Sequence, residues 1–281
     1  KKSSYDSKIN HQSPGNCSYE IPKISYNLTD IGNAERFVQR FGNSVKYCPT
    51  LKQWFIWNTR IWEQDVTLKR ELYAIDTVRS IYGEAEVELD ENKRKKIAGW
   101  ATTSESYQKR TAMLQTVSSM LAIHHEELDA KKDLFNLQNG TYNLSTHTFQ
   151  EHQQDDLLTK MSKASFDPDA SCPTWEKHLD LIFGNDEDLI NGFQELCGYS
   201  LLSGNPDEIF VICWGNGRNG KGKTLDTLAY IHGDYCRDAL FDSFTSNDKS
   251  ASGSGANNDM ARLVGARLVK ASESKAGAKL D

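Results

Sequence analysis

This sequence lacks two patterns that would assign it to a special environment. Its six cysteines include no C-x-x-C pair, which excludes a zinc ribbon, and their scatter does not suit a disulfide scaffold. No stretch approaches the roughly 18 apolar residues that cross a membrane, and the N-terminus has no apolar signal core. These absences predict a soluble, cytoplasmic protein with no membrane partner.

An excess of positive charge is also missing. The formal net charge is −6 at pH 7, which excludes a polycationic nucleic-acid binder. Any surface for nucleic acid must therefore be local, or be built by assembling several copies of the chain.

Length and composition predict a tail and two domains. At roughly 100–200 residues per domain, a chain of 281 residues has about two. Residues 1–27 are polar, which indicates a tail or linker, and the proline- and aspartate-containing stretch 166–175 marks a junction. We therefore expect an N-terminal domain at 28–170 and the first part of a second domain at 171–281, as in a fragment of a longer protein.

The fold class is α/β, and the N-terminal domain is predicted to be mostly helical. Thr29 or Asp30 can cap a helix, and Gly42 can end it, which predicts a helix over 28–42. Residues 66–130 also have a helical pattern with charged faces.

Two small hairpins interrupt these helices. Aromatic and polar residues alternate over 54–65, and the three tryptophans there suit a small aromatic core better than stacking on DNA bases. Asn139-Gly140 is flanked by alternating apolar residues, which is a strong hairpin signal over 134–152.

The second domain alternates helices and short apolar runs. Glycine- and serine-rich residues 245–259 indicate a loop. Apolar runs of strand length and helical spacing predict the remaining elements. These are helices over 175–183, 186–202 and 224–233, and strands over 208–214 and 267–273.

The most informative stretch is GNGRNGKGKT, residues 215–224, between a predicted strand and a predicted helix. In a phosphate-binding loop, glycines let backbone N–H groups surround the phosphates, a lysine neutralises the γ-phosphate, and a Ser/Thr hydroxyl usually ligates Mg²⁺. The alternative is a solvent-exposed Gly-Asn turn. The candidate nucleotide-binding residues are Gly215, Asn216, Gly217, Arg218, Asn219, Gly220, Lys221, Gly222, Lys223 and Thr224.

The loop permits two registers of G-x-x-x-x-G-K-[ST]. A start at Gly217 matches the pattern fully and ends on Lys223-Thr224. A start at Gly215 makes Lys221 the phosphate lysine and suits a loop that leaves the strand directly. Composition alone leaves the choice open.

An ATPase also needs an acid at the tip of a neighbouring strand, where it holds Mg²⁺ and the attacking water. Glu273 follows the second apolar run and can take this role. An exposed glutamate after an edge strand is the alternative.

Five segments, taken in order, resemble the phage- and plasmid-type primase–helicases, which are related to the poxvirus primase–helicase and carry a superfamily 3 helicase domain. The resemblance covers most of residues 28–281. The segments are LTDIGNAERFVQRFG with WFIWNTRIWEQD, LQNGTYNLST with FDPDASCPTWEKHL, QELCGYSLLSGNPDEIFVICWGNGRNGKG, IHGDYC, and ARLVGARLVKASES.

This resemblance bears on the register. The family's loop is similar to G-x-G-x-N-G-K-[S/G], which makes Lys221 the phosphate lysine and Glu273 the acid of the second ATP motif. Gly222 stands where many relatives have serine, so Thr224 is the remaining candidate for a Mg²⁺-binding hydroxyl if the loop shifts. The implied cofactors are ATP and Mg²⁺, with Lys221 and Glu273 as catalytic residues.

The resemblance further implies a P-loop AAA+ type ATPase domain that assembles into a ring, usually a hexamer, and moves on single-stranded or forked DNA. ATP then lies between subunits. The sensor asparagine, the arginine finger and a DNA-contacting hairpin are expected beyond Asp281. A primase activity, if there is one, is expected upstream of Lys1 or in a partner.

The predicted function is that of an ATP-dependent replicative DNA helicase from a phage, plasmid or prophage, inactive as this fragment alone. One alternative is a non-catalytic module for DNA binding or oligomerisation. Another is a different P-loop NTPase, such as a small-molecule kinase.

Overall fold

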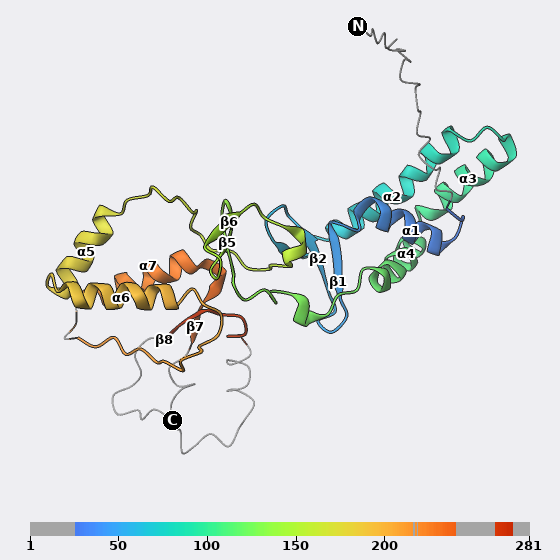
Figure 1. Ribbon diagram of the computed structural model, residues 1–281. Helices are drawn as coiled ribbons and strands as arrows, with labels where there is room; N and C mark the ends of the chain where they lie inside the picture. The colour runs from blue at the N-terminus through green and yellow to red at the C-terminus, as the bar shows by residue number, and fades with distance from the viewer. Residues whose placement is uncertain (1–25, 216, 218, 240–261, 272–281) are drawn as a thin grey trace, which may run out of the picture.

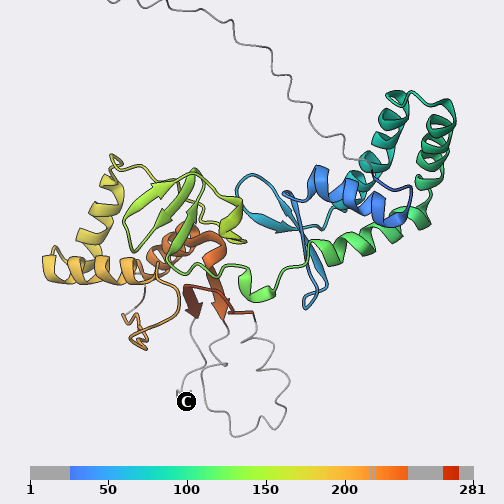
Figure 2. The ribbon, with the colours of Figure 1, turned by 45° about the vertical axis from the view of Figure 1, so that its right-hand side comes forward.

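The computed structural model places helices at the two ends of the molecule, with the β1–β3 and β4–β6 sheets between them (Figures 1 and 2). It describes residues 26–215, 217, 219–239 and 262–271. Within these residues the fold is mixed α/β, with seven α-helices and three small sheets. Helices α1–α4 form one end, and α5–α7 form the other (Figure 1).

The helices predicted for 28–42 and within 66–130 are confirmed at the end formed by α1–α4. The N–H of Gly32 donates to the side chain of Thr29 at 3.1 Å, and Gly42 follows the last residue of α1. The cap at Thr29 is therefore confirmed. The four helices are α1 Asp30–Phe41, α2 Lys69–Glu86, α3 Glu91–Ser104 and α4 Tyr107–Met120.

The first sheet contains the predicted 54–65 hairpin. Its antiparallel strands are β1 Val45–Cys48, β2 Gln53–Trp57 and β3 Trp62–Gln64. Trp62 is only 1% exposed, and its indole N–H donates to the Gln154 carbonyl at 2.9 Å, so this tryptophan is a core residue. The main core joins this sheet to α1, α2 and α4 through Ala34, Phe37, Val45, Ile56, Ala74, Val78, Met113, Leu114, Val117 and Leu121.

The second sheet confirms the hairpin at Asn139-Gly140. Its antiparallel strands are β4 Leu134–Leu137, β5 Gly140–Asn143 and β6 Thr148–Gln150. Leu137 pairs with Gly140, so the tight turn lies where the sequence predicted it. Short 3₁₀ turns at His125–Glu127 and Gln154–Asp156 flank this sheet.

The other end holds α5 Pro173–Phe183, α6 Glu187–Tyr199 and α7 Lys221–His232, which confirms the three helices predicted there. After a 3₁₀ turn at Gly233–Tyr235, β7 Cys236–Ala239 pairs in parallel with β8 Leu268–Ala271. β8 confirms the predicted strand as far as Ala271. β7 was not predicted, because its short sequence CRDA carries two charges and little apolar pattern.

A cluster of aromatic rings, which we call the joint, connects the second sheet to the end of α7. Tyr235 is 2% exposed, and its ring stacks on Phe135 of β4 with 4.7 Å between centroids. Burial raises the pKa of Tyr235 to about 12, so its hydroxyl is neutral at pH 7 and donates to the Lys160 carbonyl at 3.2 Å. The guanidinium of Arg267, just before β8, lies over both rings.

The strand predicted for 208–214 is wrong. In the structure this stretch has irregular backbone, with Ile212 70% exposed and Trp214 82% exposed. An apolar run becomes a strand only where a neighbouring strand takes its backbone N–H and C=O groups. In the described ranges the sheet at this end consists of β7 and β8 alone, and neither pairs with this run.

Part of the predicted organisation cannot be compared with the structure. The loop at 245–259 and most of the tail at 1–27 lie outside the described residues. The domain boundary at 170/171 stays a prediction. No helix of the described chain combines the length and apolarity needed to cross a bilayer.

Candidate functional site

The predicted phosphate loop leads directly into α7. Gly220 precedes the helix in the left-handed region with φ of 86°, and it has no side chain to cap the first turn. The first intrahelical hydrogen bond runs from the Thr224 N–H to the Gly220 carbonyl at 3.0 Å. The first-turn N–H groups before Thr224 therefore have no partner within the helix, which is the arrangement that attracts an anion.

Lys221, the first residue of α7, folds back over the loop. Its ammonium donates to the Gly215 carbonyl at 3.1 Å and to Asn219 Oδ1 at 3.1 Å. A Cβ placed on Gly215 would lie 1.8 Å from Asn219 Nδ2 and 3.1 Å from the ammonium of Lys221. A larger residue at 215 would therefore require the Asn219 side chain to move. The structure thus brings Gly215, Asn219 and Lys221 together, and the phosphate role of Lys221 stays a prediction.

The second candidate pair, Lys223 and Thr224, takes no part in this cluster. Lys223 is exposed on α7. Thr224 is 5% exposed and faces the protein interior, where its hydroxyl lies 3.2 Å from the Gly220 carbonyl and 2.9 Å from His178 Nε2. The Thr224 hydroxyl is therefore already engaged by the protein. The Mg²⁺-binding role of Thr224, which was predicted only for a shifted loop, stays a prediction.

The structure describes only some of the remaining predicted site residues. Gly217 is described, and its φ of 85° requires the conformational freedom of glycine. Asn216, Arg218 and Glu273 lie outside the described residues. Among the described residues no group of three His, Cys, Asp or Glu side chains could hold a metal ion.

Ion pairs attach α7 to the parallel sheet beside it. Lys270 of β8 lies 2.9 Å from Asp226 Oδ1 on α7 and 3.5 Å from Asp238 Oδ1 on β7. The hydrogen bond from Lys270 lowers the pKa of Asp226 and raises the pKa of Lys270. Both effects favour the charged pair, but Asp226 is largely exposed, so the pair adds little to the stability of the contact between α7 and β8.

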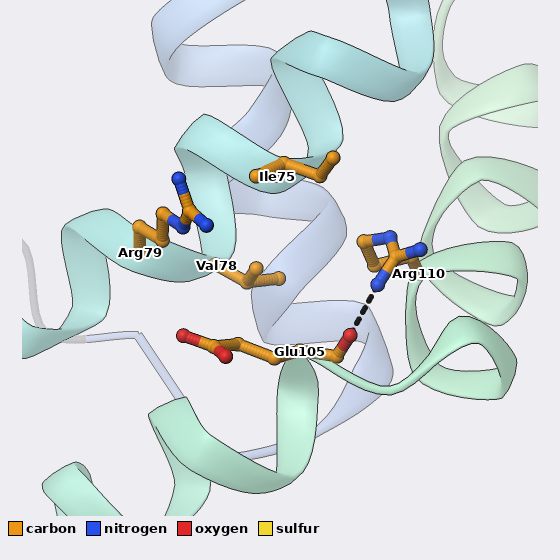
Figure 3. A pocket seen from close by; sticks show the side chains of 5 residues that line it. All are labelled: Ile75, Val78, Arg79, Glu105 and Arg110. Carbon is orange, nitrogen blue, oxygen red and sulfur yellow. Dashed lines mark hydrogen bonds between the residues drawn. The ribbon is translucent and has the colours of Figure 1, made fainter.

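A cavity at the other end is not a comparable candidate. It lies between α2 and the start of α4, and Figure 3 shows the Arg110 guanidinium donating to the Glu105 carbonyl at its wall. Its volume of about 110 Å³ is well below the roughly 300–1,000 Å³ of small-molecule pockets. Its lining residues are Ile75, Val78, Arg79, Glu105 and Arg110.

Comparison with known families assigns the N-terminal part of the chain to a family. Residues 34–184 match the family described as D5 N terminal like, and this match spans more than half of the chain. The chain belongs to the D5 N-terminal-like family. That family is associated with primase–helicase proteins, and the matched region is consistent with their N-terminal module. A search of curated proteins finds no match.

The D5 N-terminal-like region reaches the predicted phosphate loop. It extends through α5, which carries His178 and Ile182. A Cβ placed on Gly220 would lie 2.8 Å from Ile182 Cγ2 and 3.1 Å from His178 Cε1. The last helix of the matched region therefore packs directly against the residue that starts α7.

Sequence reasoning missed His178, Tyr235 and Arg267. His178 meets Thr224 across 46 positions, and Arg267 meets Leu134 across 133 positions. Neither contact has a local sequence signal. The aromatic character of Tyr235 and the basic side chains in the RLVGARLVK segment were visible, but no spacing rule links them.

Gly222 offers a test of the missing hydroxyl. It is the second residue of α7, and a Cβ placed there meets nothing within 4 Å. We expect Gly222→Ser to fold normally and to gain about 0.5 kcal/mol of stability from helix propensity. We also expect it to tighten nucleotide binding about threefold with Mg²⁺ present and to leave binding unchanged with EDTA.

The matched control is Gly192→Ser, because Gly192 also lies inside a helix with open space around its Cα. Denaturant titration and nucleotide titration measure the two variants side by side. Equal effects of both serines on nucleotide affinity would contradict the prediction.

Proposed function

We propose that this chain belongs to an ATP-dependent replicative DNA helicase and that residues 215–224 bind the phosphates of ATP. Membership of the D5 N-terminal-like family supports a primase–helicase-type replication protein. The observation that carries the ATPase part is the cluster of Lys221, Gly215 and Asn219 at the open N-terminus of α7. A folded-back lysine and first-turn N–H groups together suit a polyphosphate.

Under this proposal each part of the site has a defined task. The loop backbone and the first turn of α7 surround the phosphates, and the ammonium of Lys221 exchanges its two protein acceptors for phosphate oxygens. ATP supplies the free energy for movement along DNA. Glu273 is the proposed acid for the attacking water, and in the sequence it lies two residues after Ala271, the described end of β8.

The experiment is ATP hydrolysis by the full-length protein with and without single-stranded DNA. We expect hydrolysis that single-stranded DNA stimulates severalfold and that depends on Lys221. A small-molecule kinase or another P-loop NTPase would hydrolyse ATP without this stimulation. DNA binding that weakens with salt, in a protein that hydrolyses no ATP, would contradict the helicase.

One observation favours a second candidate, an oligomerisation module. The run 209–214 is apolar, and several of its side chains are exposed, including Ile212 and Trp214. Apolar surface of this kind marks sites of association between proteins. Sedimentation of the chain over a range of concentrations, with and without ATP, separates the two: a module assembles regardless of nucleotide, whereas a motor's ring responds to it.

A further inference from the structure

The contact between α5 and the start of α7 has a consequence for nucleotide binding. His178 comes from the D5 N-terminal-like region, and its Nε2 lies 2.9 Å from Thr224 Oγ1. Thr224 is 5% exposed and His178 is half-buried, so this hydrogen bond is partly shielded from water. A shielded hydrogen bond between two elements restrains both of them.

The same histidine also restrains the helix start. The Thr224 hydroxyl lies 3.2 Å from the Gly220 carbonyl, and the Thr224 N–H donates to that carbonyl at 3.0 Å. With the hydroxyl proton on the Gly220 carbonyl, Nε2–H of His178 donates to Thr224 Oγ1. The imidazole, the hydroxyl and the carbonyl then form one chain of hydrogen bonds around the first turn of α7.

The imidazole is itself held in place. Its ring lies 5.7 Å from the Trp175 ring, and Trp175 in turn lies 6.5 Å from Phe193 of α6. Phe183, the last residue of α5, also packs on Phe193, at 5.4 Å. α5 therefore packs on α6 through these half-buried rings, and His178 acts from a helix rather than from a loop.

The first turn of α7 sets the direction of Lys221. Lys221 is the residue directly after Gly220, and Gly220 has no room for a side chain between Ile182 and His178. A small rotation of this turn would carry the Lys221 ammonium away from Gly215 and Asn219. Positioning of this kind changes binding even when the residue responsible never touches the ligand.

We propose that His178 is a positioning residue of the phosphate loop, through which the D5 N-terminal-like region orients Lys221 for nucleotide. This inference rests on the proposed function of the loop. It adds that the matched region is part of the nucleotide site's support. It also explains why the Thr224 hydroxyl is used within the protein.

The test is a double-mutant cycle on His178 and Thr224, with ATP as the probe. We expect His178→Ala and Thr224→Val each to weaken ATP binding about tenfold, which corresponds to the loss of one part-buried hydrogen bond. The double variant should also bind ATP about tenfold more weakly than wild type, and no more weakly than either single variant, because both changes remove the same contact. His178→Gln, which can still hydrogen-bond to the hydroxyl, should restore affinity to within about threefold of wild type.

The matched control is His125→Ala, a change at an exposed histidine in the other half of the molecule. It should leave ATP affinity unchanged. Two outcomes would overturn the proposal. One is a loss of ATP affinity in the double variant that equals the product of the two single losses, and the other is a His178→Gln variant that binds ATP as weakly as His178→Ala.

A second measurement does not need nucleotide. Amide hydrogen exchange of Thr224, whose N–H donates to the Gly220 carbonyl, should accelerate about tenfold in His178→Ala, and α1–α4 should exchange as in wild type. Unchanged exchange of the Thr224 amide overturns the positioning role. If the wild-type chain fails to bind ATP, the proposed function of the loop fails, and these exchange rates alone decide whether His178 holds the turn.

Discussion

Lys221→Ala is expected to abolish ATP hydrolysis in the full-length protein and to weaken nucleotide binding by about 10- to 100-fold. The Lys221 ammonium lies over the loop, within 3.1 Å of both the Gly215 carbonyl and Asn219 Oδ1, where phosphate oxygens would replace these acceptors. A hydrogen bond to a charged group contributes roughly 1.5–3 kcal/mol, and about 1.4 kcal/mol corresponds to tenfold in affinity. Nucleotide titration and steady-state hydrolysis measure both effects.

Lys223→Ala is the matched control for this prediction. Lys223 lies two residues further along the same helix but is exposed and outside the cluster. We expect it to retain most of the nucleotide affinity and to lose less hydrolysis than Lys221→Ala. Comparable losses in the two variants, or a larger loss for Lys223, would show that the other register of the loop is used.

Arg267→Ala is expected to destabilise the joint between the second sheet and the α7 end by about 3 kcal/mol. The guanidinium donates to the Leu201 carbonyl at 2.6 Å and to the Leu134 carbonyl at 2.5 Å. It also lies 4.7 Å from the centre of the Tyr235 ring. Each buried carbonyl left without its donor costs roughly 1–3 kcal/mol, and the lost contact with the rings adds to this.

The cost is partly offset because burying the guanidinium is itself unfavourable, and this burial lowers the pKa of Arg267. Native-state hydrogen exchange measures the net effect. A loss of about 3 kcal/mol accelerates exchange in β4 and β8 about 100-fold if these strands open together. Helices α1, α2 and α4 have their own core and should exchange as before.

Arg237→Ala provides the control for the joint. Arg237 lies on the neighbouring strand β7, and among the described residues it donates to the Cys236 carbonyl beside it, at 3.1 Å. We expect its loss to change exchange in β4 little. Faster exchange in β4 after Arg237→Ala, or none after Arg267→Ala, would show that the aromatic rings alone hold the joint.

Much of the local structure was predictable because its causes are local. The Thr29 cap and the Asn139-Gly140 turn each depend on a few adjacent residues, and both are where the sequence predicted them. The start of α7 after a glycine-rich turn is likewise close to prediction. The strand predicted for 208–214 is wrong within the described residues, where this apolar run has irregular backbone, because an apolar pattern alone does not determine strand pairing.

The sequence by itself determined the helices, both hairpins and the position of the glycine-rich loop, since propensity, capping and turn chemistry act over a few residues. Only the tertiary structure decided which side chains meet at that loop. It places the Lys221 ammonium against the Gly215 carbonyl and leaves Lys223 exposed. It also brings the Thr224 hydroxyl within hydrogen-bonding distance of His178. These outcomes depend on how α5 packs against α7, which follows from packing between distant segments rather than from any local pattern.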